Sequence, residues 1–200
     1  MPAPERRAAI HRMEFALDLY LKALATRDHE KDTGHLSVEA YRRLNQLRML
    51  LGWVIELQHN HSRMLKHEPM EVYESAMNEC ELHCETFYYV AFRFLNVLQC
   101  LPGLHGCRCK PIADIRHNLI EHAENQTKGI MFNAFSWGSF DDGPVIKPVL
   151  GGDPPRTVDR GLYVNLADLS VAVCNAVKRY LGRDVELPND AEWRDDAASG

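Results

Sequence analysis

The chain lacks any long apolar run. None of its 200 residues belongs to an unbroken apolar stretch of eighteen, and its first residues do not have the basic, apolar and small segments of a secretion leader. We therefore expect no membrane span and a soluble, cytoplasmic protein. Long Gly/Ser linkers, low-complexity segments and internal repeats are missing too. With 46% hydrophobic residues, the sequence predicts one domain, residues 1–183, built on one sizeable core.

Several signatures of catalysis and cofactor binding are also missing. Gly151 and Gly152 are not part of a phosphate-binding loop, because the Lys and Ser/Thr of that fingerprint are absent. No serine occupies a nucleophile elbow. The six cysteines of a chain this large, with no secretion signal, are expected to be free thiols rather than a disulfide framework. We expect no cofactor.

A long basic stripe is absent, and the formal net charge is −5. That charge is concentrated at the end of the chain, because from Asp184 onward six acidic residues face only Arg194. Residues 184–200 therefore read as an acidic, disordered tail, and residues 1–183 are formally neutral. A neutral body permits RNA binding without predicting it.

Apolar residues recur at helical spacing through most of the body. They predict helices over about residues 5–28, from Ser37 to just before Pro69, over about 70–101, after Pro111, and from about 165 to 182. The third has the clearest seam, with apolar positions separated alternately by four and three residues, as in antiparallel bundles. These positions are Tyr73, Met77, Cys80, Cys84, Phe87, Ala91, Phe94, Leu98 and Leu101.

Capping and breaking residues mark the expected helix ends. Ser37 is predicted to cap the second helix, and Asn165, with Asp168 three residues on, to cap the last. Pro102 and Gly103 should end the third helix, and Gly182 the last.

The helical periodicity of the sequence is interrupted at residues 130–164. Turn signals at 141–144 and 151–155 separate short β-prone runs, among them 145–146 and 162–164, so a small hairpin or a long ordered loop fits best. The fold class we predict is all-α: an up-down helical bundle of four to five helices with a small β-prone insert at about 130–164.

The fourth predicted helix carries the segment that most suggests chemistry. Arg116, His117, Asn118 and His122 place a permanent cation, an amide and two imidazoles within two helical turns. An Arg, then a polar residue, then a His at the sixth position after the Arg resembles the Arg-x4-6-His motif of the HEPN superfamily. These are helical-bundle domains that include metal-independent RNA-cleaving toxins. The resemblance covers about residues 5–128 and the last helix.

RNA carries its own nucleophile, the 2′-hydroxyl, so cleavage needs a proton acceptor, a cation for the phosphoryl oxygens and an acid for the leaving 5′-oxygen. An imidazole exchanges protons near neutrality, and a guanidinium holds two phosphate oxygens. The resemblance implies that His122 transfers the proton and Arg116 clamps the phosphate. His117 and Asn118, with Arg108 and Lys110 just upstream, are predicted to bind substrate.

On a helix, Arg116 and His122 would lie about 120° and about 9 Å apart, so one copy of the segment does not place them on one face. HEPN nucleases form their site between two protomers. The resemblance therefore implies a two-fold dimer with the fourth helices facing each other, with RNA or a nucleotide as ligand and a neutralising antitoxin as further partner.

Alternatives remain open for the same residues. His122 falls near Leu119 on the helical wheel and reads equally as a core histidine, with Arg116 in a surface network beside Asp114 and Glu121. The protein would then be a noncatalytic dimer that binds a partner. A second alternative is a zinc site of Cys80, Cys84, Cys107 and Cys109, although the Cys107–Cys109 spacing is not that of a common zinc knuckle.

Overall fold

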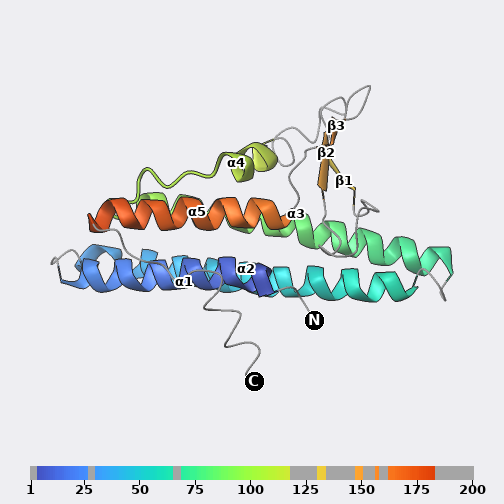
Figure 1. Ribbon diagram of the computed structural model, residues 1–200, viewed down its shortest axis with the longest axis horizontal. Coiled ribbons are helices and arrows are strands. Elements are labelled where there is room, and N and C mark those ends of the chain that lie inside the picture. Colours follow the sequence, from blue (N-terminus) through green and yellow to red (C-terminus); the bar gives the residue numbers. More distant parts are fainter. Residues whose placement is uncertain are drawn as a thin grey trace, which may run out of the picture. The chain divides into compact units, whose positions relative to one another are not determined.

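Most of the residues that the structure describes lie in helices. The computed structural model describes residues 4–26, 30–64, 69–117, 130–133, 147–150, 156–157 and 162–182. In this part of the chain lie the helices α1 (Pro4–Ala25), α2 (Glu30–Met64), α3 (Met70–Cys100), α4 (Lys110–Arg116) and α5 (Leu162–Leu181) (Figure 1). The predicted all-α bundle of four to five helices is confirmed.

The chain forms two compact units whose segments alternate along the sequence. Unit 1 contains the described residues of 1–45, 93–110 and 166–200, and unit 2 those of 46–92 and 111–165. The helices α2, α3 and α5 each contribute residues to both units. The prediction of a single domain over residues 1–183 remains a prediction, and the expected tail at 184–200 lies outside the described residues.

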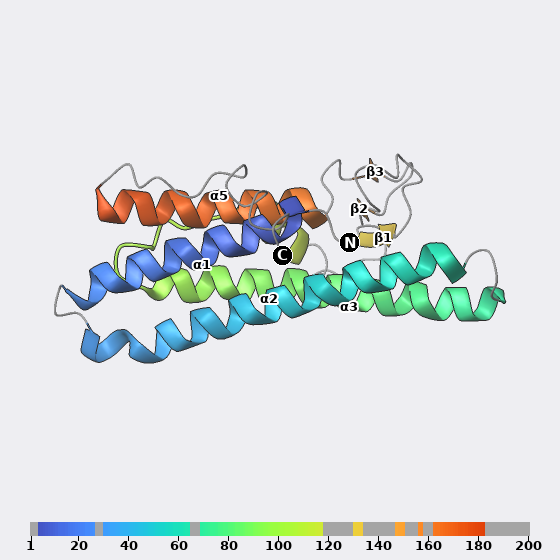
Figure 2. The same ribbon diagram turned by 60° about the horizontal axis from the view of Figure 1, so that its bottom comes forward.

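Unit 1 is a helical bundle closed by α1 and α5, which lie side by side and run in the same direction (Figures 1 and 2). Met13 and Leu17 of α1 and Leu169 of α5 are fully buried. Each such side chain contributes about 1.5–3 kcal/mol relative to an exposed one. A polar contact joins α1 to α2 as well: the Tyr41 hydroxyl of α2 donates to the Asp18 carboxylate of α1.

Unit 2 is organised by a helical hairpin, in which the second part of α2 lies beside the first part of α3 (Figure 2). The predicted α3 seam is confirmed where its side chains are described. Its buried members are Cys80, Cys84, Phe87, Ala91, Phe94, Leu98 and Leu101, the last three of which belong to unit 1. Opposite, Leu47, Leu51 and Val54 of α2 are buried, and the Trp53 and His83 rings lie 5.2 Å apart.

The β-prone insert forms a three-stranded antiparallel sheet in the order β1 (Ile130–Asn133), β2 (Lys147–Leu150) and β3 (Arg156–Thr157). Ile130 pairs with Leu150, and Leu150 in turn pairs with Arg156. The β-prone run at 145–146 falls outside the described residues, directly before β2. The run at 162–164 was assigned wrongly, because it forms the first turn of α5.

Both predicted N-caps are wrong. Ser37 lies inside α2, and its hydroxyl donates to the carbonyl of Thr33 at 3.2 Å, because the helix continues back through Gly34 to Glu30. Gly34 weakens this turn by only about 1 kcal/mol relative to alanine. Asn165 lies inside α5 and is fully buried, where its Nδ2 donates to the Tyr88 hydroxyl at 2.7 Å within unit 2.

The predicted C-terminal signals are correct. Gly103 follows α3 with φ of +74°, and Gly182 follows α5 with φ of +64°. Both values fall in the left-handed region that glycine enters without the steric cost borne by other residues. The Gly182 amide donates to the Lys178 carbonyl at 3.0 Å and so closes the last turn of α5.

Candidate functional site

The first part of the Arg-to-His motif lies at the end of α4. Pro111 occupies the second position of this helix, where its missing N–H costs nothing, and Ile112 and Ile115 anchor it through buried side chains. Arg116 is the last residue of α4, where a cation interacts favourably with the negative end of the helix dipole. The helix thus presents the motif arginine at its terminus.

Arg116 is held against an aromatic ring of α3. Its Cζ lies 4.4 Å from the centroid of the Phe92 ring, and both residues belong to unit 2. A cation over an aromatic face is stabilised by about 0.5–2 kcal/mol, depending on its desolvation. Both side chains are half-buried, whereas the next residue, His117, is exposed. Asn118 and His122 lie outside the described residues.

Arg108 and Lys110 are both exposed and belong to unit 1, whereas Arg116 and His117 belong to unit 2. The predicted substrate-binding residues therefore come from both units. Arg108 stands between two buried residues, Cys107 and Cys109, and Lys110 follows at the start of α4. This alternation of buried and exposed side chains is that of an extended chain with one face turned inward.

The cysteines occupy separate places. Cys80 and Cys84 are buried neighbours on α3, and the hydrogen bond between them, followed by burial, raises the pKa of the Cys84 thiol. In unit 1, burial is the main cause that raises the pKa of Cys107 to about 12, with Cys109 and Cys174 as lesser causes. Such thiols stay protonated at neutral pH.

The alternative zinc site is not assembled in the described part of the chain. Cys80 and Cys84 fall in unit 2, and Cys107 and Cys109 in unit 1. Among the described residues, no three His, Cys, Asp or Glu side chains come together in a way that could hold a metal ion. The exposed His105 directs its Nδ1 to the Gln99 carbonyl instead, at 2.7 Å.

The surroundings of α3 in unit 2 are acidic. Between Met70 and Phe92 this helix carries five glutamates and neither lysine nor arginine. Burial and the neighbouring carboxylate of Glu85 raise the pKa of Glu81. These carboxylates oppose the approach of a polyanion to this helix.

Sequence reasoning missed two contacts. No local sequence signal pairs Phe92 with Arg116, because the two residues lie far apart along the chain. The contact of Arg179 has no local signal either. Its guanidinium lies next to Gly106 in the segment between α3 and α4, where a Cβ atom on the glycine would be 3.8 Å from Nη2.

No family model matches the chain, and neither the curated proteins nor the solved structures contain a match to it. In the part of the chain that the structure describes, no helix combines the length and apolar character needed to cross a bilayer.

Proposed function

We propose that the protein is a metal-independent endoribonuclease of the toxin or defence type, acting as a two-fold dimer. The observation that carries the proposal is the placement of Arg116. It ends α4, its guanidinium rests on Phe92, and the next side chain, His117, is open to solvent. A guanidinium carries a planar fork of N–H donors that can bind two phosphate oxygens.

In the proposed reaction the 2′-oxygen attacks the adjacent phosphorus, and the bond from phosphorus to the 5′-oxygen breaks. His122 takes the proton of the 2′-hydroxyl, and a water molecule donates the proton that the departing 5′-oxygen takes up. Arg116 stabilises the charge on the nonbridging oxygens, and His117 and Asn118 position the strand. The products are a 2′,3′-cyclic phosphate and a 5′-hydroxyl.

The test is incubation of purified protein with end-labelled RNA in EDTA. We expect cleavage with cyclic-phosphate ends, a loss of about 10²–10⁴-fold in His122→Ala, and a loss of about 10²–10³-fold in Arg116→Ala. Arg48→Ala is the matched control, because it removes an exposed arginine of the same unit on another helix. No cleavage by the parent protein, or an equal loss in the control, contradicts the proposal.

Phe92 is a positioning residue in this proposal. Phe92→Leu should lower kcat/KM by about 2–30-fold, the kinetic equivalent of a lost cation–π contact, whereas Phe92→Trp should retain activity. If leucine and tryptophan behave alike, the ring does not act through Arg116.

A second candidate function is binding without catalysis, and one observation favours it. The hairpin of unit 2 leaves Met49, Trp53 and Leu82 exposed, at 54%, 44% and 59%. Met49 and Trp53 lie one turn apart on α2, and exposed apolar side chains that are neighbours in this way are typical of protein interfaces. If the parent protein does not cleave RNA, and Trp53→Gln changes its oligomeric state or abolishes copurification of a protein such as an antitoxin, this second function is the better account.

A further inference from the structure

The segment between α3 and α4 turns its cations outward by burying the residues between them. Cys107 and Cys109 are 0% and 4% exposed, while Arg108 and Lys110 are exposed. The two thiols fill the core of unit 1, so the intervening arginine and the following lysine must point away from it. The Cys-x-Cys spacing, which is unsuited to zinc, is suited to this arrangement.

The segment is fixed in place from both sides. The Gln99 side chain donates from Nε2 to the Cys107 carbonyl at 2.7 Å, and the Gln99 carbonyl accepts the bond from His105. Gly103 lies so close to Tyr180 of α5 that no side chain fits between them. A surface that is already ordered loses little conformational entropy when it binds a ligand.

A third cation joins these two from α5. The Arg179 guanidinium lies next to Gly106, and its charge acts on the thiol of Cys107. We call Arg108, Lys110 and Arg179 the basic ridge. All three are exposed and belong to unit 1, and in the part of the chain that the structure describes none of them forms an ion pair with a carboxylate.

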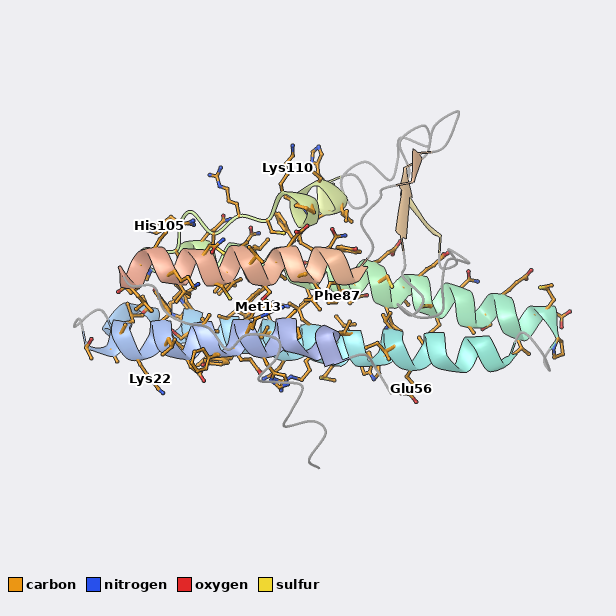
Figure 3. The ribbon with its side chains drawn as sticks, viewed as in Figure 1. Met13, Lys22, Glu56, Phe87, His105 and Lys110 are labelled. Carbon is orange, nitrogen blue, oxygen red and sulfur yellow. The ribbon has the colours of Figure 1, made fainter. Side chains whose placement is uncertain are left out.

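Carboxylates are excluded from this stretch of sequence as well. No Asp or Glu occurs from residue 86 to residue 113, although the whole chain carries 28 acidic residues. Within this stretch, no carboxylate offsets the charges of Arg108 and Lys110. Figure 3 shows Lys110 and His105 on one side of unit 1, beyond α5, and Lys22 of α1 on the opposite side.

We propose that the basic ridge binds the phosphate backbone of single-stranded RNA without regard to base sequence. Its three exposed cations suit phosphate contacts, and none of the ridge residues is aromatic, so base stacking is not part of the recognition. The choice of RNA rests on the proposed function. The ridge deepens that function by giving RNA a binding surface in unit 1.

Binding is tested on a labelled single-stranded oligonucleotide whose 2′-hydroxyls are all methylated, which cannot be cleaved by 2′-oxygen attack. Fluorescence anisotropy gives Kd at several salt concentrations. For single strands each phosphate contact contributes a slope of about 0.7 in log Kd against log salt, so the double variant Arg108→Gln/Lys110→Gln should lower the slope by about 1.4. At 0.1 M salt the double variant should therefore bind the strand roughly 25-fold more weakly than the parent protein does.

Lys22→Gln is the matched control, because it removes an exposed lysine of the same unit from the opposite side. It should leave both Kd and the salt slope unchanged. Circular dichroism should show all variants folded, since the substituted side chains are exposed.

The outcomes separate the ridge from the nuclease. The ridge proposal is overturned if the parent protein does not bind the methylated strand, or if the control and the double variant lose the same affinity for it. It is also overturned if the ridge is needed for binding to anionic vesicles but not for binding to the strand. Ridge-dependent binding together with intact natural RNA after incubation would keep the ridge and overturn the nuclease.

Discussion

Replacing Gly103 with alanine would place a methyl group where the ring of Tyr180 already lies. The added Cβ would be 2.2 Å from Cδ2 and 2.8 Å from Cε2 of that ring, against about 3.5–4.0 Å for an ordinary carbon contact. Tyr180 is not free to retreat without further cost. Its ring packs edge-on against Tyr20 at 4.9 Å, and the Tyr20 hydroxyl donates to the Pro102 carbonyl at 2.8 Å.

The loss of stability in Gly103→Ala has two parts, and substitutions at other glycines separate them. The left-handed backbone at Gly103 costs about 1–2 kcal/mol for alanine, and the overlap with Tyr180 adds about 1–3 kcal/mol. Gly182 also has positive φ but nothing within 4 Å of an added Cβ, so Gly182→Ala measures the first part alone. Gly52 lies inside α2 with open space around it, so Gly52→Ala should stabilise by about 0.5–1 kcal/mol.

Urea unfolding of the three variants gives the comparison. We expect a loss of roughly 2–5 kcal/mol for Gly103→Ala, distinctly larger than for Gly182→Ala. Placing Gly103→Ala in a Tyr180→Ala background should reduce its cost to the backbone part, because the obstructing ring is gone. If the Gly103 and Gly182 variants lose the same free energy of unfolding, or if the second substitution restores nothing, the close contact with Tyr180 does not exist as described.

Three further predictions concern buried polar groups and thiols. Burial, and secondarily Tyr180, raise the pKa of Tyr20, so the contribution of Tyr20 to stability is present below about pH 10 and is lost as the pH rises further. In denaturant titrations above about pH 10, the free energy of unfolding should fall more steeply with pH for the parent protein than for Tyr20→Phe. Asn165→Ala should lower the free energy of unfolding by about 1–3 kcal/mol and couple to Tyr88→Phe by about 0.5–1.5 kcal/mol in a double-mutant cycle; additive losses would exclude the bond between them. Cys100 is the one exposed thiol of the six, so a thiol reagent should modify one cysteine quickly in the native protein and all six in denaturant. If the fast reaction disappears in Cys100→Ala, the rapidly modified cysteine is Cys100.

Local periodicity was sufficient to predict the helices. The α3 seam and the glycines at 103 and 182 are positions where side-chain spacing and backbone freedom decide the structure, and each is observed as expected. The two N-cap predictions failed because the role of a polar side chain depends on which groups it contacts in the folded structure. Asn165 reads as a cap on its own, but burial against Tyr88 outweighs that local preference.

The site was predictable only in part. The sequence places Arg116 and His117 next to each other, yet the contact of Arg116 with Phe92 joins residues of different helices, and no local pattern encodes such a pair. The same holds for Arg179 beside Gly106. In the Cys107–Lys110 segment, by contrast, the sequence already shows the alternation of cysteine and cation, and the structure buries the two cysteines and exposes Arg108 and Lys110.

The alternation of the two units along the chain has a consequence for synthesis on the ribosome. The apolar face of α1 needs α5, as the contacts of Tyr20 with Tyr180 and of the Cys174 thiol with the Arg12 carbonyl show. Nearly the whole polypeptide must therefore emerge before α1 is covered, while the α2–α3 hairpin can close as soon as its own two helices are made. A nascent chain that stalls before α5 would expose Met13 and Leu17 to chaperones, and no single cut yields a fragment in which unit 1 is complete.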